Sequence, residues 1–192
     1  DGGFGRRCRA FGFPGAIASF EPGAQAFRRL SNAISVDGAW QAYRCALGDE
    51  GGDLTLHVAA NSGASSSFLP MLAAHEEAAP GAKYVEDEIV PVRRLDEWYA
   101  ANGTEWSRPA LKIDTQGYKH KVLAGAEAML NNLVSLQIEL SLVPLYEGSW
   151  LWIDAVDWAR DHGFELAGVD PGLWDPNTGR LLQLDAAFVN KS

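Results

Sequence analysis

The sequence lacks the features by which several classes of protein are usually identified. No apolar run approaches the roughly 20 residues that cross a bilayer, so no membrane-spanning segment is expected. The chain opens DGGFGRRCR, without the apolar stretch of a secretory signal, which favours a cytoplasmic protein with no membrane partner. Cysteine is limited to Cys8 and Cys45, which argues against a disulfide framework and predicts two small buried residues in a reducing compartment. No spacing typical of metal ligands is apparent, so no bound metal is predicted.

Basic residues are also few. The chain has 16 Lys and Arg against 25 Asp and Glu, which gives a formal net charge of −9. An acidic surface argues against nucleic acid as a partner, because that binding needs Lys and Arg to neutralise phosphates. The one basic cluster, Arg6, Arg7 and Arg9, is expected to be a solvated helix face. Nothing in the composition indicates an oligomeric state.

What the sequence does contain is the balance of a single globular domain. Its 192 residues are 47% hydrophobic and 21% charged, which suits one sizeable core. Strand and helix patterns alternate, which predicts a three-layer α/β fold with a mostly parallel sheet. The expected strands span residues 16–20, 40–47, 54–58, 86–94, 110–113, 134–140, 165–169 and 184–189, and the expected helices span residues 4–11, 24–34, 95–101, 118–131 and 153–162.

Ligands of such folds bind at the carboxyl ends of the strands, so the residues that follow each strand are the candidates. Glu21 follows the first expected strand, where a carboxylate can accept hydrogen bonds from the two hydroxyls of a ribose. It lies 19 positions after Gly2, close to the usual spacing from a glycine loop; the alternative is an exposed Glu before a Pro turn. Asp49 follows the next strand and could accept from an adenine amine, or it could belong to a Gly-Asp turn.

The segment from Lys112 to Gly117 is the most informative strand end. Charged residues flank a buried strand there, and a charged cluster at such a place is costly unless it is paired or functional. Lys112 and Asp114 share one face and could form an ion pair, so Asp114 is either a site residue or a structural partner. On the following strand Gln137, Glu139 and Ser141 also share a face, and Glu139 has the same two interpretations.

Two further groups of residues are weaker candidates. His120 begins the helix after Gly117, where it could act as a general base or be an ordinary surface histidine. Loop aromatics could line an acceptor pocket or form a hydrophobic plug, and the sequence does not separate these alternatives. These aromatics are Tyr146, Trp150, Trp152 and Trp174.

Six short motifs occur in order along the chain, and together they resemble the FkbM-type methyltransferases. They are Ser19-Phe20-Glu21-Pro22, Ala46-Leu47-Gly48-Asp49, Lys112-Ile113-Asp114-Thr115-Gln116-Gly117-Tyr118, Val122-Leu123-Ala124-Gly125-Ala126, Ile138-Glu139-Leu140-Ser141 and Gln183-Leu184-Asp185-Ala186. Each motif is weak alone, whereas the ordered set is specific. The resemblance extends from the first residues to about Asn190.

The resemblance implies a Rossmann-like class I methyltransferase sheet of seven strands with an antiparallel last strand. It also implies S-adenosylmethionine as the methyl donor and a hydroxyl oxygen as the usual acceptor. By position, Glu21 would bind the ribose, Asp49 would lie near the adenine, and Asp114 would lie near the methionine end and the acceptor.

The chain departs from the family pattern at two places. The family's helix after Gln-Gly-Tyr usually begins with Glu, whereas this chain has Lys119, which either alters the acceptor or is a surface change. The family's cofactor loop reads roughly Asp-x-Gly-Ala-Asn-x-Gly after a first strand, and here only its end is present, with Asp1 at the variable position and Gly2 as the final glycine. We therefore expect one methyltransferase domain truncated at its N-terminus, without the first strand. We expect this chain to bind the cofactor poorly and a version extended upstream to bind it well.

These observations predict transfer of a methyl group from S-adenosylmethionine to a hydroxyl of a sugar or other small metabolite. Asp114 is the first choice as proton acceptor, with Glu139 and His120 in reserve, and Gly2 joins Glu21, Asp49 and Asp114 as a cofactor-binding residue. The expected acceptor-binding residues are Lys112, Gln116, Tyr146 and Trp150. Two rival functions are a non-catalytic methyltransferase-like module, which the incomplete loop favours, and an NAD-dependent oxidoreductase on a similar fold.

Overall fold

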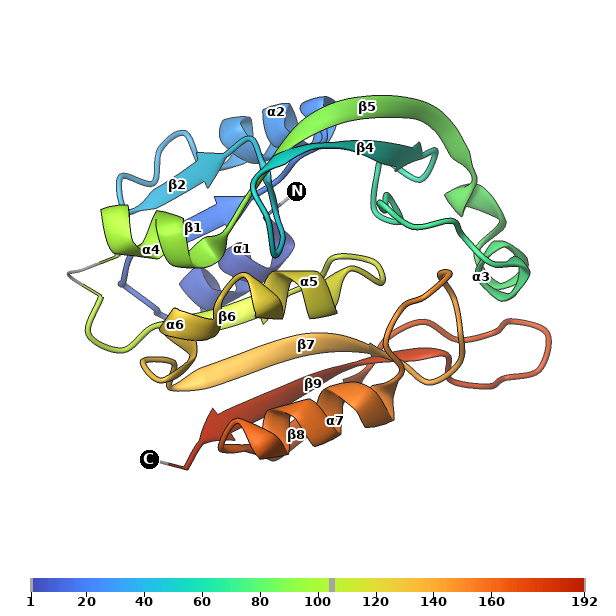
Figure 1. Cartoon of the computed structure of the whole chain (residues 1–192). Coiled ribbons are helices and arrows are strands. Elements are labelled where there is room, and N and C mark those ends of the chain that lie inside the picture. Colours follow the sequence, from blue (N-terminus) through green and yellow to red (C-terminus); the bar gives the residue numbers. More distant parts are fainter. Residues whose placement is uncertain (1, 104–105, 192) are drawn as a thin grey trace.

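A computed structural model describes residues 2–103 and 106–191 of the chain (Figure 1). The helices are α1 (Gly3–Ala10), α2 (Ala24–Ala33), α3 (Ala73–Ala78), the 3-10 helix η1 (Pro80–Ala82), α4 (Leu95–Asn102), α5 (Lys119–Ala124), α6 (Glu127–Leu130) and α7 (Trp152–Asp161). The strands are β1 (Ile17–Phe20), β2 (Trp40–Tyr43), β3 (Ala46–Leu47), β4 (Gly52–Ala59), β5 (Tyr84–Arg93), β6 (Ala110–Ile113), β7 (Ser135–Ser141), β8 (Phe164–Pro171) and β9 (Gln183–Asn190). The mixed α/β class is confirmed, while α3 and η1 were not predicted. None of the described helices has the length and apolar character needed to cross a bilayer.

The described strands form three sheets with the orders β1-β2, β3-β5-β4 and β6-β7-β9-β8. Parallel pairs are β1–β2, β3–β5 and β6–β7, whereas β4–β5, β7–β9 and β8–β9 are antiparallel. The prediction of a mostly parallel sheet is therefore wrong for the described strands, because the long β4–β5 pair and the position of β9 between β7 and β8 add antiparallel pairs. The antiparallel last strand is observed, since β9 runs against both of its neighbours.

Strands β1 and β6 each have one edge without a strand partner among the described residues. β1 pairs only with β2, and β6 pairs only with β7. Even so, the two strands share a core, because Ala18 and Phe20 of β1 pack against the buried cluster that contains Ile113 of β6. Phe20 also contacts Trp98 of α4, with 5.1 Å between the ring centroids in an edge-to-face arrangement. The two sheets are thus joined by side chains rather than by a common ladder.

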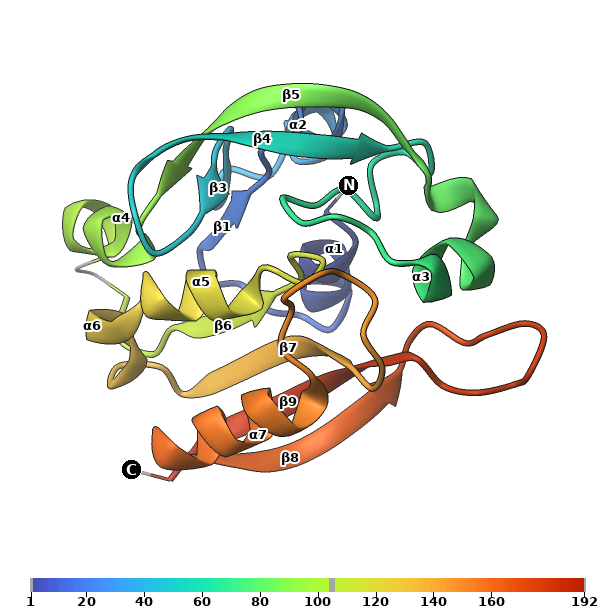
Figure 2. The ribbon, with the colours of Figure 1, turned by 45° about the vertical axis from the view of Figure 1, so that its right-hand side comes forward.

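The main hydrophobic core lies between the β6-β7-β9-β8 sheet and helices α4 to α7 (Figure 1). The apolar stripe of α7 places Ala155 and Ala159 in this core, where both are fully buried. The side chain of Asp154 accepts a hydrogen bond of 2.9 Å from the backbone N–H of Leu151, which fixes the start of α7. In Figure 2 the antiparallel strands β4 and β5 run across the top of the molecule, and α3 lies in the connection between them.

Two predicted elements are divided in the structure. The strand expected over residues 40–47 is split, because β2 pairs with β1 whereas β3 pairs with β5, and a turn at Arg44 and Cys45 separates them. The helix expected over residues 118–131 is divided into α5 and α6 at Gly125. A side chain at Gly125 would overlap the carbonyl group of Gly48, so only glycine allows this close approach.

Candidate functional site

The loop after β6 turns sharply and directs one polar side chain back over the strand ends. Gln116 has φ 44°, in the left-handed region that costs a non-glycine residue free energy, and Gly117 follows with φ 93°. A side chain at Gly117 would lie 3.0 Å from Cβ of Tyr146, so the turn is also tight. The backbone carbonyl of Gln116 accepts a hydrogen bond of 2.7 Å from the hydroxyl of Ser67. This strained turn is therefore held in place by the segments around it.

The side-chain amide of Gln116 joins the two carboxyl groups predicted from the strand ends. Its Nε2 donates to Oδ1 of Asp114 at 3.0 Å and to Oε2 of Glu139 at 3.1 Å. Gln183, on β9, donates to the same Oε2 of Glu139 at 2.9 Å. We call Asp114, Gln116, Glu139 and Gln183 the carboxyl cluster. Its members lie at or just after the ends of β6, β7 and β9, so the structure brings Asp114 and Glu139 together.

The two carboxyl groups of this cluster have different environments. Burial, reinforced by the nearby charge of Asp114, raises the pKa of Glu139 to about 8, although Lys119 and Lys112 oppose the shift. Glu139 is therefore largely protonated at neutral pH. The side chain of Asp114 is 52% exposed, so it is the carboxyl group that a ligand can reach. One group thus holds a proton while its neighbour is open to solvent.

Tyr146 orients the amide of Gln116 in the carboxyl cluster. Its ring is buried, and its hydroxyl donates a 2.9 Å hydrogen bond to Oε1 of Gln116. Burial raises the pKa of Tyr146, so the phenol stays protonated and remains a donor. Because Oε1 of Gln116 accepts from Tyr146, its Nε2 must point toward Asp114 and Glu139. Tyr146 therefore fixes the orientation of the amide.

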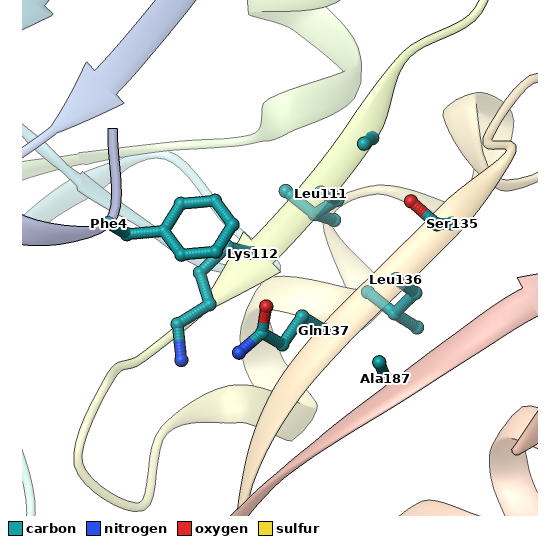
Figure 3. A pocket seen from close by; sticks show the side chains of 8 residues that line it. Phe4, Leu111, Lys112, Ser135, Leu136, Gln137 and Ala187 are labelled. Carbon is teal, nitrogen blue, oxygen red and sulfur yellow. The ribbon is translucent and has the colours of Figure 1, made fainter. Parts of the chain in front are cut away.

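Lys112 is bound to carboxylates on both sides. Its ammonium group donates to Asp185 on β9 and lies 3.8 Å from Asp114, which confirms the expected Lys112–Asp114 pair and adds a partner. A cavity of about 110 Å³ lies near Lys112, and Phe4 of α1 lies beside Lys112 there, with Gln137 on the neighbouring strand (Figure 3). Ligand pockets usually measure about 300 Å³ or more, so this cavity is too small for a cofactor.

Glu21 and Asp49, which we call the outer carboxylates, lie at the ends of β1 and β3. Oε1 of Glu21 accepts a 3.2 Å hydrogen bond from the backbone N–H of Gly23, and burial raises the pKa of Glu21. Asp49 forms an ion pair of 2.6 Å with Lys121 of α5, and the hydrogen bond from Lys121 lowers the pKa of Asp49. Glu21 therefore retains acceptor capacity, whereas one oxygen of Asp49 is already bound.

The remaining predicted residues lie around these two groups. The ring of His120 is 5.7 Å from the Trp150 ring, and burial lowers the pKa of His120, so the imidazole is neutral at neutral pH. Gly2 has φ 73° and precedes α1, where a side chain would crowd Leu30 and Trp40. Trp152 and Trp174 are about half exposed. Asp1 lies outside the described residues.

A comparison with models of known protein families identifies the family of this chain. The Methyltransferase FkbM domain model matches residues 9–166. The chain belongs to the FkbM methyltransferase family. Neither a curated protein nor a solved structure gave a significant match. The resemblance inferred from the ordered motifs is thereby confirmed, and the family indicates methyl transfer in general.

Within this FkbM domain, the side chain of Lys119 is buried, which the sequence did not reveal. It begins α5 and is only 1% exposed, so the interpretation of Lys119 as a surface change is wrong. Burial lowers the pKa of Lys119, while the charges of Glu139 and Asp114 oppose that shift. Gln183 and Asp185 were also missed as site residues. Their alternation on the last strand, which places both on one face, was the available signal.

The FkbM domain therefore offers acceptors and proton-carrying groups rather than metal ligands. Within residues 2–103 and 106–191, no group of three or more His, Cys, Asp or Glu side chains could hold a metal ion. The carboxyl cluster can accept a proton at Asp114 and hold one at Glu139. The outer carboxylates can accept hydrogen bonds from a polar ligand.

Proposed function

We propose that this FkbM domain transfers a methyl group from S-adenosylmethionine to a hydroxyl oxygen of a sugar or another small hydroxylated metabolite. The observation that carries the proposal is the Gln116 amide that holds Asp114 beside Glu139 at the ends of adjacent strands. In this proposal the only partners are small molecules, with neither nucleic acid nor a membrane. The scarcity of cysteine supports a reducing, cytoplasmic setting.

The outer carboxylates fit the polar parts of the cofactor. Among the described residues, one hydrogen bond reaches the half-buried carboxyl group of Glu21, at Oε1, so this group can accept from both ribose hydroxyls. Asp49 has a second oxygen free for the adenine amine, because Lys121 binds only Oδ2. Asp114 would face the methionine end. When bound, S-adenosylmethionine supplies an electrophilic methyl group on a sulfonium.

The carboxyl cluster supplies what an attacking hydroxyl needs. Asp114 is exposed and accepts the proton as the oxygen becomes bonded to carbon. Glu139, the expected reserve acceptor, already holds a proton at neutral pH and can take that role only after losing it. His120 is neutral and could serve as a second reserve. Orientation of the acceptor provides most of the rate enhancement, and we assign it to Lys112, Gln116 and Trp150. Tyr146, which is buried, acts through Gln116.

The unpaired edges of β1 and β6 support the proposal that an upstream segment completes the domain. An upstream strand followed by the glycine loop would pair with both edges and place backbone N–H groups beside Glu21. Without that segment, each unpaired buried backbone group costs about 1–3 kcal/mol. We therefore propose that residues 1–192 form a methyltransferase domain that lacks part of its cofactor site.

Calorimetric titration with S-adenosylhomocysteine, on this chain and on a version extended upstream, tests the proposed function. We expect micromolar or tighter binding by the extended version and much weaker binding by this chain. Equally tight binding by both would refute the truncation. Binding by neither would favour the non-catalytic module, and preferential binding of NADH would favour the oxidoreductase.

A further inference from the structure

Lys119 is a buried cation without a hydrogen-bond partner. Its side chain begins α5, directly above the strand ends that carry the carboxyl cluster, and the residue is 1% exposed. Within the part of the chain that the structure describes, its Nζ makes no hydrogen bond. A buried ammonium is costly to keep, so its charge must be balanced by groups nearby. The charges that act most strongly on it are those of Glu139 and Asp114.

Lys112, the other lysine beside the carboxyl cluster, is already paired with two carboxylates. Lys112 donates to Asp185 and lies 3.8 Å from Asp114, so its charge is shared between those two carboxylates. Glu139 receives hydrogen bonds only from amides, which carry no net charge. Among the described residues, Lys119 is therefore the lysine near Glu139 that is not already paired with another carboxylate, although the charge of Lys112 also acts on Glu139. A positive charge nearby makes it easier for a buried carboxyl group to give up its proton.

We propose that Lys119 is a positioning residue that places a positive charge beside the carboxyl cluster and so allows Glu139 to give up its proton when Asp114 takes one. The proposal rests on the proposed function only in that methyl transfer to a hydroxyl needs a proton acceptor at this place. In the exchange the hydroxyl proton goes to Asp114, and Glu139 releases its own proton to solvent. The pair then carries one proton before and after the step. Lys119 keeps its three protons and touches no reacting atom.

The surroundings of Glu139 support this role. The titratable or charged side chains that act on Glu139 come from β6, α5, β9 and the loop after β7. They are Asp114, Lys112, Lys119, Asp185 and Tyr146. Tyr146 remains protonated, and Lys112 and Asp185 neutralise each other. Burial is the main cause that raises the pKa of Glu139, and among the nearby charges Asp114 and Lys119 act on it most strongly and in opposite directions.

Carboxyl titration by ¹³C nuclear magnetic resonance on the 192-residue chain tests the proposal. We expect Glu139 to titrate near pH 8 in the wild type and about 1–3 pH units higher in Lys119→Met, since an opposite charge nearby is lost. Lys121→Met is the matched control, because Lys121 lies on the same helix but pairs with Asp49. That control should raise the midpoint of Asp49 and leave Glu139 as in the wild type.

Two outcomes would overturn the inference. One is a Glu139 midpoint that is the same in Lys119→Met as in the wild type, and the other is an equal shift in Lys121→Met. If Lys119→Met does not fold, the ¹⁵Nζ signal of Lys119 in the wild type decides, because it should show an inflection at the Glu139 midpoint. A signal without that inflection refutes the role. Binding of S-adenosylhomocysteine is measured separately, so loss of the proposed function and loss of this inference remain distinguishable.

Discussion

The carboxyl cluster and the outer carboxylates are built in different ways. Asp114 and Glu139 lie at the ends of strands that belong to one four-stranded sheet, and amides from two further positions bind them. Glu21 and Asp49 end short strands that belong to two separate sheets. One contacts only its own turn by a hydrogen bond, and the other is bound to a lysine of α5. The first region is therefore held by several hydrogen bonds between neighbouring strands, whereas each outer carboxylate is held by a separate local contact.

Under the proposed function, this difference indicates how the acceptor and cofactor parts of the site are divided. Catalytic groups must be held within a fraction of an ångström, and the carboxyl cluster meets this requirement through side-chain hydrogen bonds within one sheet. A cofactor site can be completed from elsewhere, provided that its acceptors are in place. Changes in the carboxyl cluster should therefore alter turnover, and changes at the outer carboxylates should alter cofactor affinity.

The largest expected effect is that of Asp114→Asn. Removal of the proton acceptor should reduce turnover by about 10²–10⁴-fold, because the amide keeps the shape but cannot take a proton. Affinity for S-adenosylhomocysteine should change little. Release of S-adenosylhomocysteine by the upstream-extended version, with the best acceptor from a panel of sugars, measures the first quantity. An unchanged rate would remove Asp114 from the mechanism and break the proposed division.

The next largest effect is expected where Gly125, between α5 and α6, contacts the backbone of Gly48. Gly125→Ala should lower the free energy of unfolding by about 2 kcal/mol, because its methyl group would overlap the backbone of Gly48, next to Asp49. Urea denaturation followed by circular dichroism measures this change. Gly38→Ala is the control, since nothing lies within 4 Å of its added methyl group. Equal stabilities of the two variants would show that the backbone at Gly48 can move to accept the added methyl group.

A smaller effect is expected from Glu21→Gln, with the pattern opposite to that of Asp114→Asn. Affinity for S-adenosylhomocysteine should fall about tenfold, because a hydrogen bond from the ribose to a charged carboxylate is worth about 1.4 kcal/mol more than one to the neutral amide oxygen of Gln. Turnover at saturating cofactor should persist. Because burial raises the pKa of Glu21, wild-type affinity should also fall as the pH drops through that raised value, whereas the variant should lack this dependence. Glu165→Gln, at an exposed position of β8, is the control. An affinity that Glu21→Gln does not change would exclude Glu21 from the cofactor site.

The smallest effect is expected from Tyr146→Phe. Loss of the 2.9 Å hydrogen bond to Gln116 should lower the free energy of unfolding by about 1 kcal/mol. Turnover should fall several-fold, because the Gln116 amide is no longer held in one orientation. Thermal denaturation and the assay used for Asp114 measure both. A variant with normal turnover would show that the strand ends alone hold the carboxyl cluster.

Strand-end reasoning located the main polar groups but not their contacts. Asp114 and Glu139 were each singled out as polar groups at the ends of buried strands, and in the structure they share a hydrogen-bond donor. The alternation of residues along a strand also separated polar from apolar faces correctly on β7, where Leu136, Ile138 and Leu140 are buried. These features depend on local periodicity, which a sequence records directly.

The features that were missed depend on tertiary contacts. Nothing in residues 40–47 signals that the two halves join different sheets, because both halves are apolar. The break at Gly125 reflects a backbone 77 positions earlier in the chain, at Gly48. The burial of Lys119 depends on where the first turn of α5 lies above the sheet. A hydrophobic pattern cannot supply that placement.

The left-handed backbone of Gln116 means that stability and activity favour different residues at position 116. A residue without a long side chain, such as glycine, would relieve the roughly 1–3 kcal/mol of backbone strain, and asparagine would relieve part of it. Neither would span Asp114, Glu139 and Tyr146 at once, since asparagine is one methylene shorter. Laboratory evolution for heat resistance alone should therefore drift toward short residues at position 116 and lose the bridge. Retention of glutamine under such selection would report that methyl transfer was being selected as well.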